Sequence, residues 1–178
     1  MSQTEETFIS HLIEMRNRLL RAVLAVVIIF ICLFPWAQDL YALLAKPLLA
    51  ALPKGGQMIA TEVTTPFFVP MKVTMMAAFL LALPWVFYQA WAFVAPGLYQ
   101  HEKRLGVPLV IASVILFVTG MAFAYFLVFP IVFGFMVGVA PAGVAVMTDI
   151  GKYLDFVMTL FMAFGITFEV PIAVVLLV

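Results

Sequence analysis

The most unusual acidic residue of this sequence is Glu169, the only charged residue in the apolar run 156–178. A carboxylate at membrane depth costs about 2.5–3.5 kcal/mol on insertion scales, so such residues usually face a bundle interior, a cavity or a partner. Gly165 lies one turn earlier, and Pro171 frees the carbonyl of Thr167, which predicts a kink. Two interpretations stay open. Glu169 forms a structural hydrogen bond between helices, or it contacts a polar group of a transient partner.

Two further acidic residues, Glu14 and Glu102, lie close to basic ones. Residues 7–20 form a predicted amphipathic helix in which Glu14 and Arg18 make an i,i+4 pair on the polar face. Glu102 follows a Pro-Gly loop and precedes two basic residues. A solvated loop charge is the simpler interpretation of Glu102. If a basic ligand binds at this face, Glu102 and Glu14 supply two carboxylates to it.

Arg16 departs from the amphipathic pattern, because it projects at the centre of the apolar face, between Leu12 and Leu19. Its long side chain either snorkels to the interface and touches lipid phosphate, or is placed against a polar group of another helix.

The sequence contains no motif typical of an enzyme, a cofactor site or a metal site. A phosphate-binding Gly-Lys loop, a zinc-protease motif and a nucleophile elbow are all missing. His11 and His101 stand alone, and Cys32 is the single cysteine. We therefore predict a non-enzymatic protein with no cofactor and no metal.

Composition places the chain in a membrane. Of its 178 residues, 66% are apolar and 10% are charged, whereas soluble domains have about 45–50% and about 25%. The formal net charge is zero, so charge gives no indication of a nucleic-acid partner. The fold class predicted is an all-α, polytopic integral membrane helical bundle.

The apolar runs predict a single membrane domain over residues 1–178 with four spans, since each span needs about 20 residues. The expected spans cover approximately residues 19–36, 73–94, 105–129 and 153–178. Residues 37–70 are expected to form a loop, with a short helix at 38–49 as an option. Residues 131–140 are too short for a further span and are expected to be interfacial.

Basic residues near the span ends favour a cytoplasmic N-terminus. On that side we count Arg16, Arg18, Arg21, Lys103 and Arg104; on the other, Lys46, Lys54, Lys72 and Lys152. The sequence stops within an apolar run, so we expect the chain to be truncated inside its fourth span.

Three stretches together resemble the TatC family, the multi-spanning subunit of the twin-arginine protein translocase. They are residues 11–19 (HLIEMRNRL), 91–104 (WAFVAPGLYQHEKR) and 168–171 (FEVP). Residues 66–68 and 123–126 also fit. The departure is Met15, where the family usually has Leu, and this volume-conserving exchange puts little in doubt.

The resemblance implies a signal-peptide receptor and core subunit of a translocase that exports folded proteins across the bacterial inner membrane, driven by the proton gradient. The family has six spans, so this chain would hold the first four. By the same resemblance, Glu14 and Glu102 would meet the two arginines of the signal peptide. The positions that match functionally sensitive ones in the family are Arg16, Pro47, Phe93 and Leu98.

The resemblance also implies partners. Glu169 would face the hollow of the bundle and contact a single-span protein, TatA or TatB, and a homo-oligomer would form within the complex. The alternative is a proton-coupled secondary transporter with Glu169 as its protonatable site. Such transporters usually show internal repeats with broken spans, and no convincing repeat is visible. An intramembrane enzyme would need paired catalytic residues, which the sequence lacks.

Overall fold

The computed structural model describes residues 3–51, 58–94, 103–139 and 147–177, and nearly all of these residues are helical. Four helical stretches are long and apolar enough to cross a membrane. They are Ile9–Lys46, Thr65–Phe93, Gly106–Met136 and Ile150–Val175. The predicted all-α polytopic membrane bundle with four spans is therefore confirmed.

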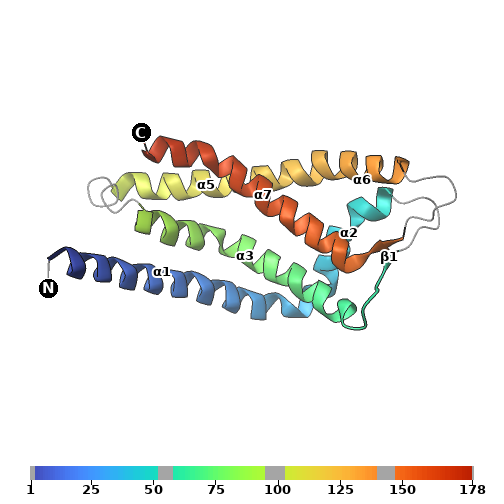
Figure 1. The fold of residues 1–178 in the computed structure, drawn as a ribbon, viewed down its shortest axis with the longest axis horizontal. Coiled ribbons are helices and arrows are strands. Elements are labelled where there is room, and N and C mark those ends of the chain that lie inside the picture. Colours follow the sequence, from blue (N-terminus) through green and yellow to red (C-terminus); the bar gives the residue numbers. More distant parts are fainter. Residues whose placement is uncertain (1–2, 52–57, 95–102, 140–146, 178) are drawn as a thin grey trace.

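The long helices run side by side, and both chain ends lie at one end of the bundle (Figure 1). Helix α1 (Gln3–Leu33) leads through the 3-10 turn Phe34–Trp36 into α2 (Ala37–Ala51). Helix α3 (Thr65–Val94) returns beside α1, and α5 (Lys103–Phe123) begins at the end of the bundle where α3 stops.

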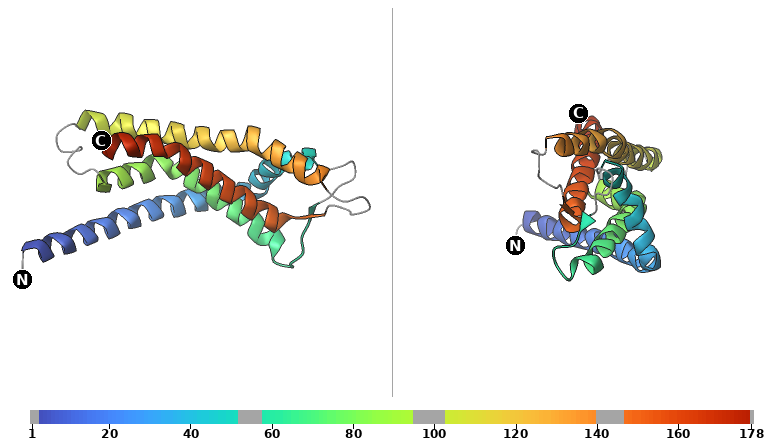
Figure 2. Two further views of the ribbon diagram at one scale, coloured as in Figure 1. Left: turned by 45° about the horizontal axis from the view of Figure 1, so that its top comes forward. Right: turned by 90° about the vertical axis from the view of Figure 1, so that its right-hand side faces the viewer.

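The second half of the chain completes the bundle. Helix α5 continues through the π-helical turn Ala124–Val128 into α6 (Phe129–Gly138). Helix α7 (Ile150–Leu177) then crosses the bundle back to the end that holds the N-terminus. In the end-on view α1 lies at one edge and α5 and α6 at the opposite edge (Figure 2).

Helix α1 packs along α3, and many of its apolar residues are exposed. Leu24, Ile28 and Ile31 are 61%, 54% and 65% exposed. Because lipid tails are as apolar as leucine, an exposed apolar face is stable in a bilayer. On the polar face of the amphipathic segment, Arg18 contacts Gln89 of α3.

The predicted loop over residues 37–70 is shorter than expected. Its optional short helix is present as α2, and α3 already begins at Thr65, so residues 65–70 are helical rather than part of a loop. Pro66 stands in the first turn of α3, where a missing N–H leaves no bond unmade. Pro70 lies deeper in the helix and leaves the Pro66 carbonyl without its usual N–H donor. Helix α3 nevertheless continues through both prolines.

The prediction that residues 131–140 form a separate interfacial segment is wrong for their described part, because the helix continues across Pro130. In the π turn, the Phe129 N–H bonds to the Ala124 carbonyl five residues earlier. The wider turn makes room for the proline ring, which in an α-helix clashes with the carbonyl four residues before it. The resulting apolar helix reaches from Gly106 to Met136.

Helices α5 and α7 approach closely at two glycines. A Cβ atom added at Gly120 would lie 2.5 Å from the Phe164 carbonyl oxygen, and one added at Gly165 would lie 2.6 Å from the Phe117 ring. Only glycine allows this separation of the two helices. The contact places Glu169, one turn after Gly165, beside α5.

At the end of the bundle opposite the termini, a two-residue parallel sheet joins β1 (Met58–Ile59) to β2 (Thr148–Asp149). Asp149 Oδ2 accepts bonds from the Thr61 backbone N–H at 3.0 Å and hydroxyl at 2.7 Å. Its Oδ1 accepts from the Lys152 N–H at 2.9 Å and so caps α7. These bonds, from the Lys152 amide first and then from Thr61, lower the pKa of Asp149 to about 2.

Candidate functional site

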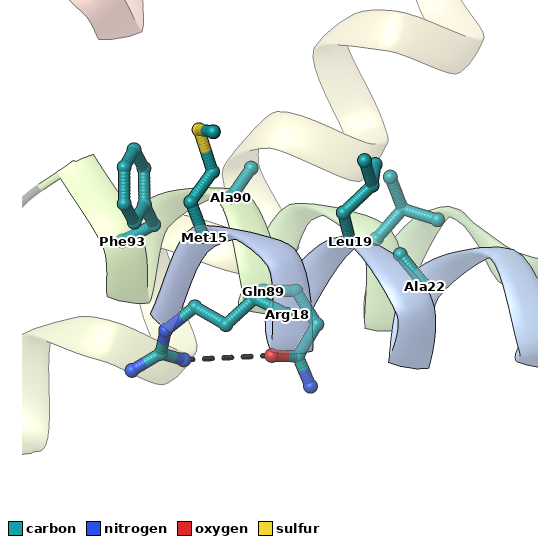
Figure 3. Close-up of a pocket in the computed structure, with 8 residues that line it drawn as sticks. Met15, Arg18, Leu19, Ala22, Gln89, Ala90 and Phe93 are labelled. Carbon is teal, nitrogen blue, oxygen red and sulfur yellow. Dashed lines mark hydrogen bonds between the residues drawn. The ribbon is translucent and has the colours of Figure 1, made fainter. Parts of the chain in front are cut away.

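The polar face of α1 meets the last turns of α3 at an ion pair. Arg18 Nε and Nη2 both donate to Glu14 Oε1, at 2.8 and 2.6 Å. Arg18 Nη1 also lies 3.4 Å from the Oε1 atom of Gln89, a side chain that is only 4% exposed (Figure 3). One arginine therefore bridges a carboxylate on α1 and a buried amide on α3.

An aromatic contact lies beside this ion pair. The His11 ring stacks on Phe93 with centroids 4.4 Å apart and planes at 16°. His11 Nδ1 is 3.9 Å from Glu14 Oε2, which is a long separation for an ion pair. The Glu14 side chain is 42% exposed. Its Oε2 atom therefore has no close hydrogen-bond donor among the described residues.

A cavity of about 180 Å³ separates the two helices here. It is lined on α1 by Met15, Arg18, Leu19 and Ala22, and on α3 by Val86, Gln89, Ala90 and Phe93 (Figure 3). A larger apolar groove of about 490 Å³ shares Leu19, Ala22 and Val86 with it. The two cavities therefore adjoin along α1, and both are lined mainly by apolar side chains.

The structure brings together some of the predicted site residues. Glu14 and Phe93 meet through His11. Arg16 is exposed, and its Nη2 atom lies 3.4 Å from Asn17 Oδ1 of the same helix. Pro47 falls within α2, at the opposite end of the bundle from the helix ends that carry Glu14 and Phe93. Leu98 and Glu102 lie outside the described residues.

Gln89 is the site residue that sequence reasoning missed. It is the only amide side chain in the apolar run 73–94, and that isolation was a usable signal. Its contact with Arg18 depends on α1 and α3 being neighbours, which the sequence does not reveal.

Glu169 lies in a different environment, between α7 and α5. Both of its carboxylate oxygens are shielded from solvent, and neither makes a hydrogen bond to the described residues. The Ser113 hydroxyl and the Phe117 amide approach the carboxyl group without reaching hydrogen-bonding geometry. Ser113 instead accepts a bond of 2.9 Å from Trp91 Nε1. A buried polar group without a partner is unfavourable, so Glu169 retains capacity for an external donor.

Over residues 10–178 the sequence matches the family described as "Sec-independent protein translocase protein (TatC)". The chain belongs to the TatC family. The TatC of Azotobacter chroococcum mcd 1 is 59% identical over 177 residues, which cover 99% of this chain and 69% of that protein. The TatC of Escherichia coli (strain K12) is 56% identical over 172 residues, covering 97% and 67% of the two chains.

The fold agrees with this assignment. A crystal structure of the twin-arginine translocase receptor TatC superposes with a TM-score of 0.84 at 36% identity, covering 94% of this chain and 74% of that one. The predicted TatC membership is confirmed, and the protein is a component of the twin-arginine translocase. It is a multi-pass membrane protein that works in a complex with other Tat subunits.

Membership in TatC bears on the other predicted classes as well. The relatives are named as translocase and receptor components rather than as enzymes. Within the described ranges, no three His, Cys, Asp or Glu side chains are grouped to hold a metal ion.

Proposed function

We propose that this TatC chain is the receptor for twin-arginine signal peptides and the core subunit of a translocase in the bacterial inner membrane. It exports folded proteins and is driven by the proton gradient. Its N-terminus and residues 95–102 face the cytoplasm. The observation that carries the proposal is the Glu14 carboxylate, which is partly exposed and has one oxygen without a close donor among the described residues.

The chemistry of the carboxylate suits a guanidinium ligand. Charge-assisted hydrogen bonds of this kind contribute about 1.5–3 kcal/mol each and favour planar, two-pronged partners. Glu14 can receive one arginine of a pair. Glu102 is proposed to receive the other, because the segment that carries it begins at Val94, next to Phe93 and at the same end of the bundle as the start of α1.

Three of the remaining predicted residues, Phe93, Leu98 and Arg16, are proposed to belong to the same peptide-binding surface. Phe93 borders the cavity beside Arg18, and Leu98 belongs to the segment that follows it. Arg16 is exposed on the same turn of α1 as Glu14 and can reach lipid phosphate or the peptide. Pro47 is too far along the bundle to share this contact and is proposed to act on the conformation of α2.

Glu169 is proposed as the contact for a single-span partner, TatA or TatB, within a complex that contains several copies of the TatC chain. Its two oxygens are buried and accept no hydrogen bond from the described residues. A polar side chain on a partner helix can donate to them, which would remove the cost of leaving them unpaired.

Crosslinking tests the proposal. A photoreactive residue at position 14 or 102 of the full-length protein in membranes should crosslink to a twin-arginine peptide, whereas one at position 169 should crosslink to single-span membrane proteins. A Lys-Lys peptide is the matched control. Absence of any peptide adduct at both 14 and 102 would contradict the receptor assignment.

The unpaired carboxyl of Glu169 also fits the second candidate, a proton-coupled transporter. The TatC membership favours the translocase. Proton flux through vesicles that contain this protein alone, without Tat partners or cargo, would favour the transporter.

A further inference from the structure

The carboxylate proposed to receive a guanidinium already holds one. Arg18 places Nε and Nη2 on Glu14 Oε1, at 2.8 and 2.6 Å. Two donors on a single oxygen occupy its lone pairs, and among the described residues the nearest cationic partner of Oε2 is the distant His11. An arriving arginine therefore meets an acid that is bound to the same chemical group.

Arg18 has a second acceptor nearby. Its Nη1 atom lies 3.4 Å from Gln89 Oε1, a distance at the outer limit for a hydrogen bond. Gln89 is buried on α3, so its amide stays in place when the side chains of α1 move. A small rotation of Arg18 away from Glu14 shortens this contact and keeps the guanidinium hydrogen-bonded.

We propose that Arg18 is a built-in competitor that lowers the affinity of the Glu14 site for any cationic ligand. The inference rests on the receptor function proposed above. A ligand guanidinium presents the same planar fork as Arg18 and replaces both of its bonds to Glu14, while Gln89 receives the displaced side chain. A ligand ammonium is a compact point charge without that fork. Displacing Arg18 costs both ligands the same free energy, so the ammonium, which makes fewer bonds to the carboxylate, keeps the lower net affinity.

Two other roles for Arg18 make different predictions. If the i,i+4 pair only stabilises α1, replacing Arg18 should leave peptide affinity and the preference for arginine unchanged. If Arg18 only positions the Glu14 carboxylate, replacing it should weaken the binding of both peptides. Competition alone predicts that binding becomes tighter when Arg18 is removed.

The test uses the full Tat complex in nanodiscs and fluorescent peptides that carry Arg-Arg or Lys-Lys. With Arg18→Gln, the Arg-Arg peptide should bind about two- to fivefold more tightly, because a partly exposed ion pair of this strength is removed. The Lys-Lys peptide should gain by about the same factor, because the free energy of displacing Arg18 does not depend on the ligand. Arg21→Gln is the matched control, since it removes the same charge one turn further along α1, and it should leave both Kd values unchanged.

Arg18→Lys gives a second measurement that preserves the charge and the helical pair but lacks the fork. It should also tighten the binding of both peptides, by a smaller factor than Arg18→Gln does. Weaker or unchanged binding of the Arg-Arg peptide to Arg18→Gln would overturn the inference. Glu14→Gln separates this failure from that of the receptor proposal. If Glu14→Gln binds peptide normally, the proposed site itself is wrong.

Discussion

Glu14 on α1 is 42% exposed and accepts two hydrogen bonds from Arg18, whereas Glu169 on α7 has both oxygens shielded and accepts none from the described residues. A partly exposed ion pair is screened by water, so its partners can be exchanged at low cost. A buried carboxyl has no water to compensate for a missing partner. The first environment suits a reversible ligand, and the second suits a partner that arrives as part of another helix.

The largest expected effect is at Glu169. Glu169→Ala should leave the protein in the membrane at normal abundance, because the carboxyl makes no hydrogen bond inside the described bundle, and should abolish crosslinking to the single-span partner. Glu169→Gln should retain much of the crosslinking, since an amide both donates and accepts. Abundance, crosslinking and export are measured for both variants.

Three results at Glu169 would contradict the proposed difference between the roles of Glu14 and Glu169. Loss of the Ala protein from the membrane would make Glu169 a structural residue. Equal damage by Gln and Ala would favour the proton-transport alternative. Normal export by a stably inserted Ala protein would remove the partner site altogether.

The next effect is at Glu14. Glu14→Ala should weaken the binding of a twin-arginine peptide about tenfold or more, because a charge-assisted hydrogen bond is lost. Glu102→Ala should act in the same direction. Titration of the labelled peptide against membranes provides the measurement, with crosslinking at position 169 as a control that should not change. Unaltered affinity in both single variants would remove these acids from the site.

Disturbing the contact between α5 and α7 should have a smaller effect. It tests whether the Glu169 region and the Glu14 region act independently. Gly165→Ala would place a methyl group 2.6–2.9 Å from three atoms of the Phe117 ring, which is only 3% exposed and cannot move aside freely. Such overpacking costs about 1–3 kcal/mol. Gly134→Ala is the matched control, because nothing lies within 4 Å of its added Cβ.

For these glycine variants, the measurements are denaturant unfolding in detergent and peptide binding. Gly165→Ala should lower stability and weaken partner crosslinking at Glu169 while peptide binding at Glu14 persists. Parallel loss of both activities would show that the two regions are not independent.

The smallest effect concerns a third carboxylate, Asp149, both of whose oxygens accept hydrogen bonds. Its pKa is about 2 in the folded protein and 3.8 without its partners. A lowered pKa stabilises the fold above the unfolded value and ceases to do so as the pH falls through the folded value. The contact of Thr61 with Asp149 should therefore persist from pH 7 to about 4 and weaken between about 4 and 2.

Hydrogen exchange of residues 58–64, corrected for intrinsic rates, measures the Asp149 contact. Asp149→Asn should show no such acid transition, and Thr61→Val should reduce protection at every pH because it removes the hydroxyl donor while the backbone donor remains. Loss of protection already between pH 7 and 5 would contradict the assignment.

The sequence predicted the parts of the site that depend on local spacing. The Glu14–Arg18 pair follows from i,i+4 geometry, and the isolation of Glu169 follows from hydropathy. Contacts between helices were not predictable. The bond from Arg18 to Gln89 requires a particular rotation of α1 against α3, and the approach of Gly165 to Phe117 requires a particular crossing of α5 and α7.

Errors in the predicted fold arose at prolines. Proline interrupts helices in water. It therefore favours a loop over residues 37–70, where Pro66 and Pro70 lie, and a helix end at Pro130. In a membrane protein, neighbouring helices, hydroxyl groups and widened turns satisfy the freed backbone groups, and the helix continues. At Pro130 the π turn provides this compensation.

The π turn also changes which side chains belong to which surface. In the helix that runs from α5 through the π turn into α6, the buried residues first recur at three- and four-residue steps, at Phe117, Met121 and Ala124. The next buried residue is Phe129, five residues on, followed by Phe133. One extra residue rotates the rest of a helix by about 100°. A regular helix would therefore place Val128 and Val132 inward and turn both phenylalanines toward the lipid. Any alignment or redesign that treats residues 103–138 as one uniform helix will consequently assign the wrong environment to every position beyond the turn.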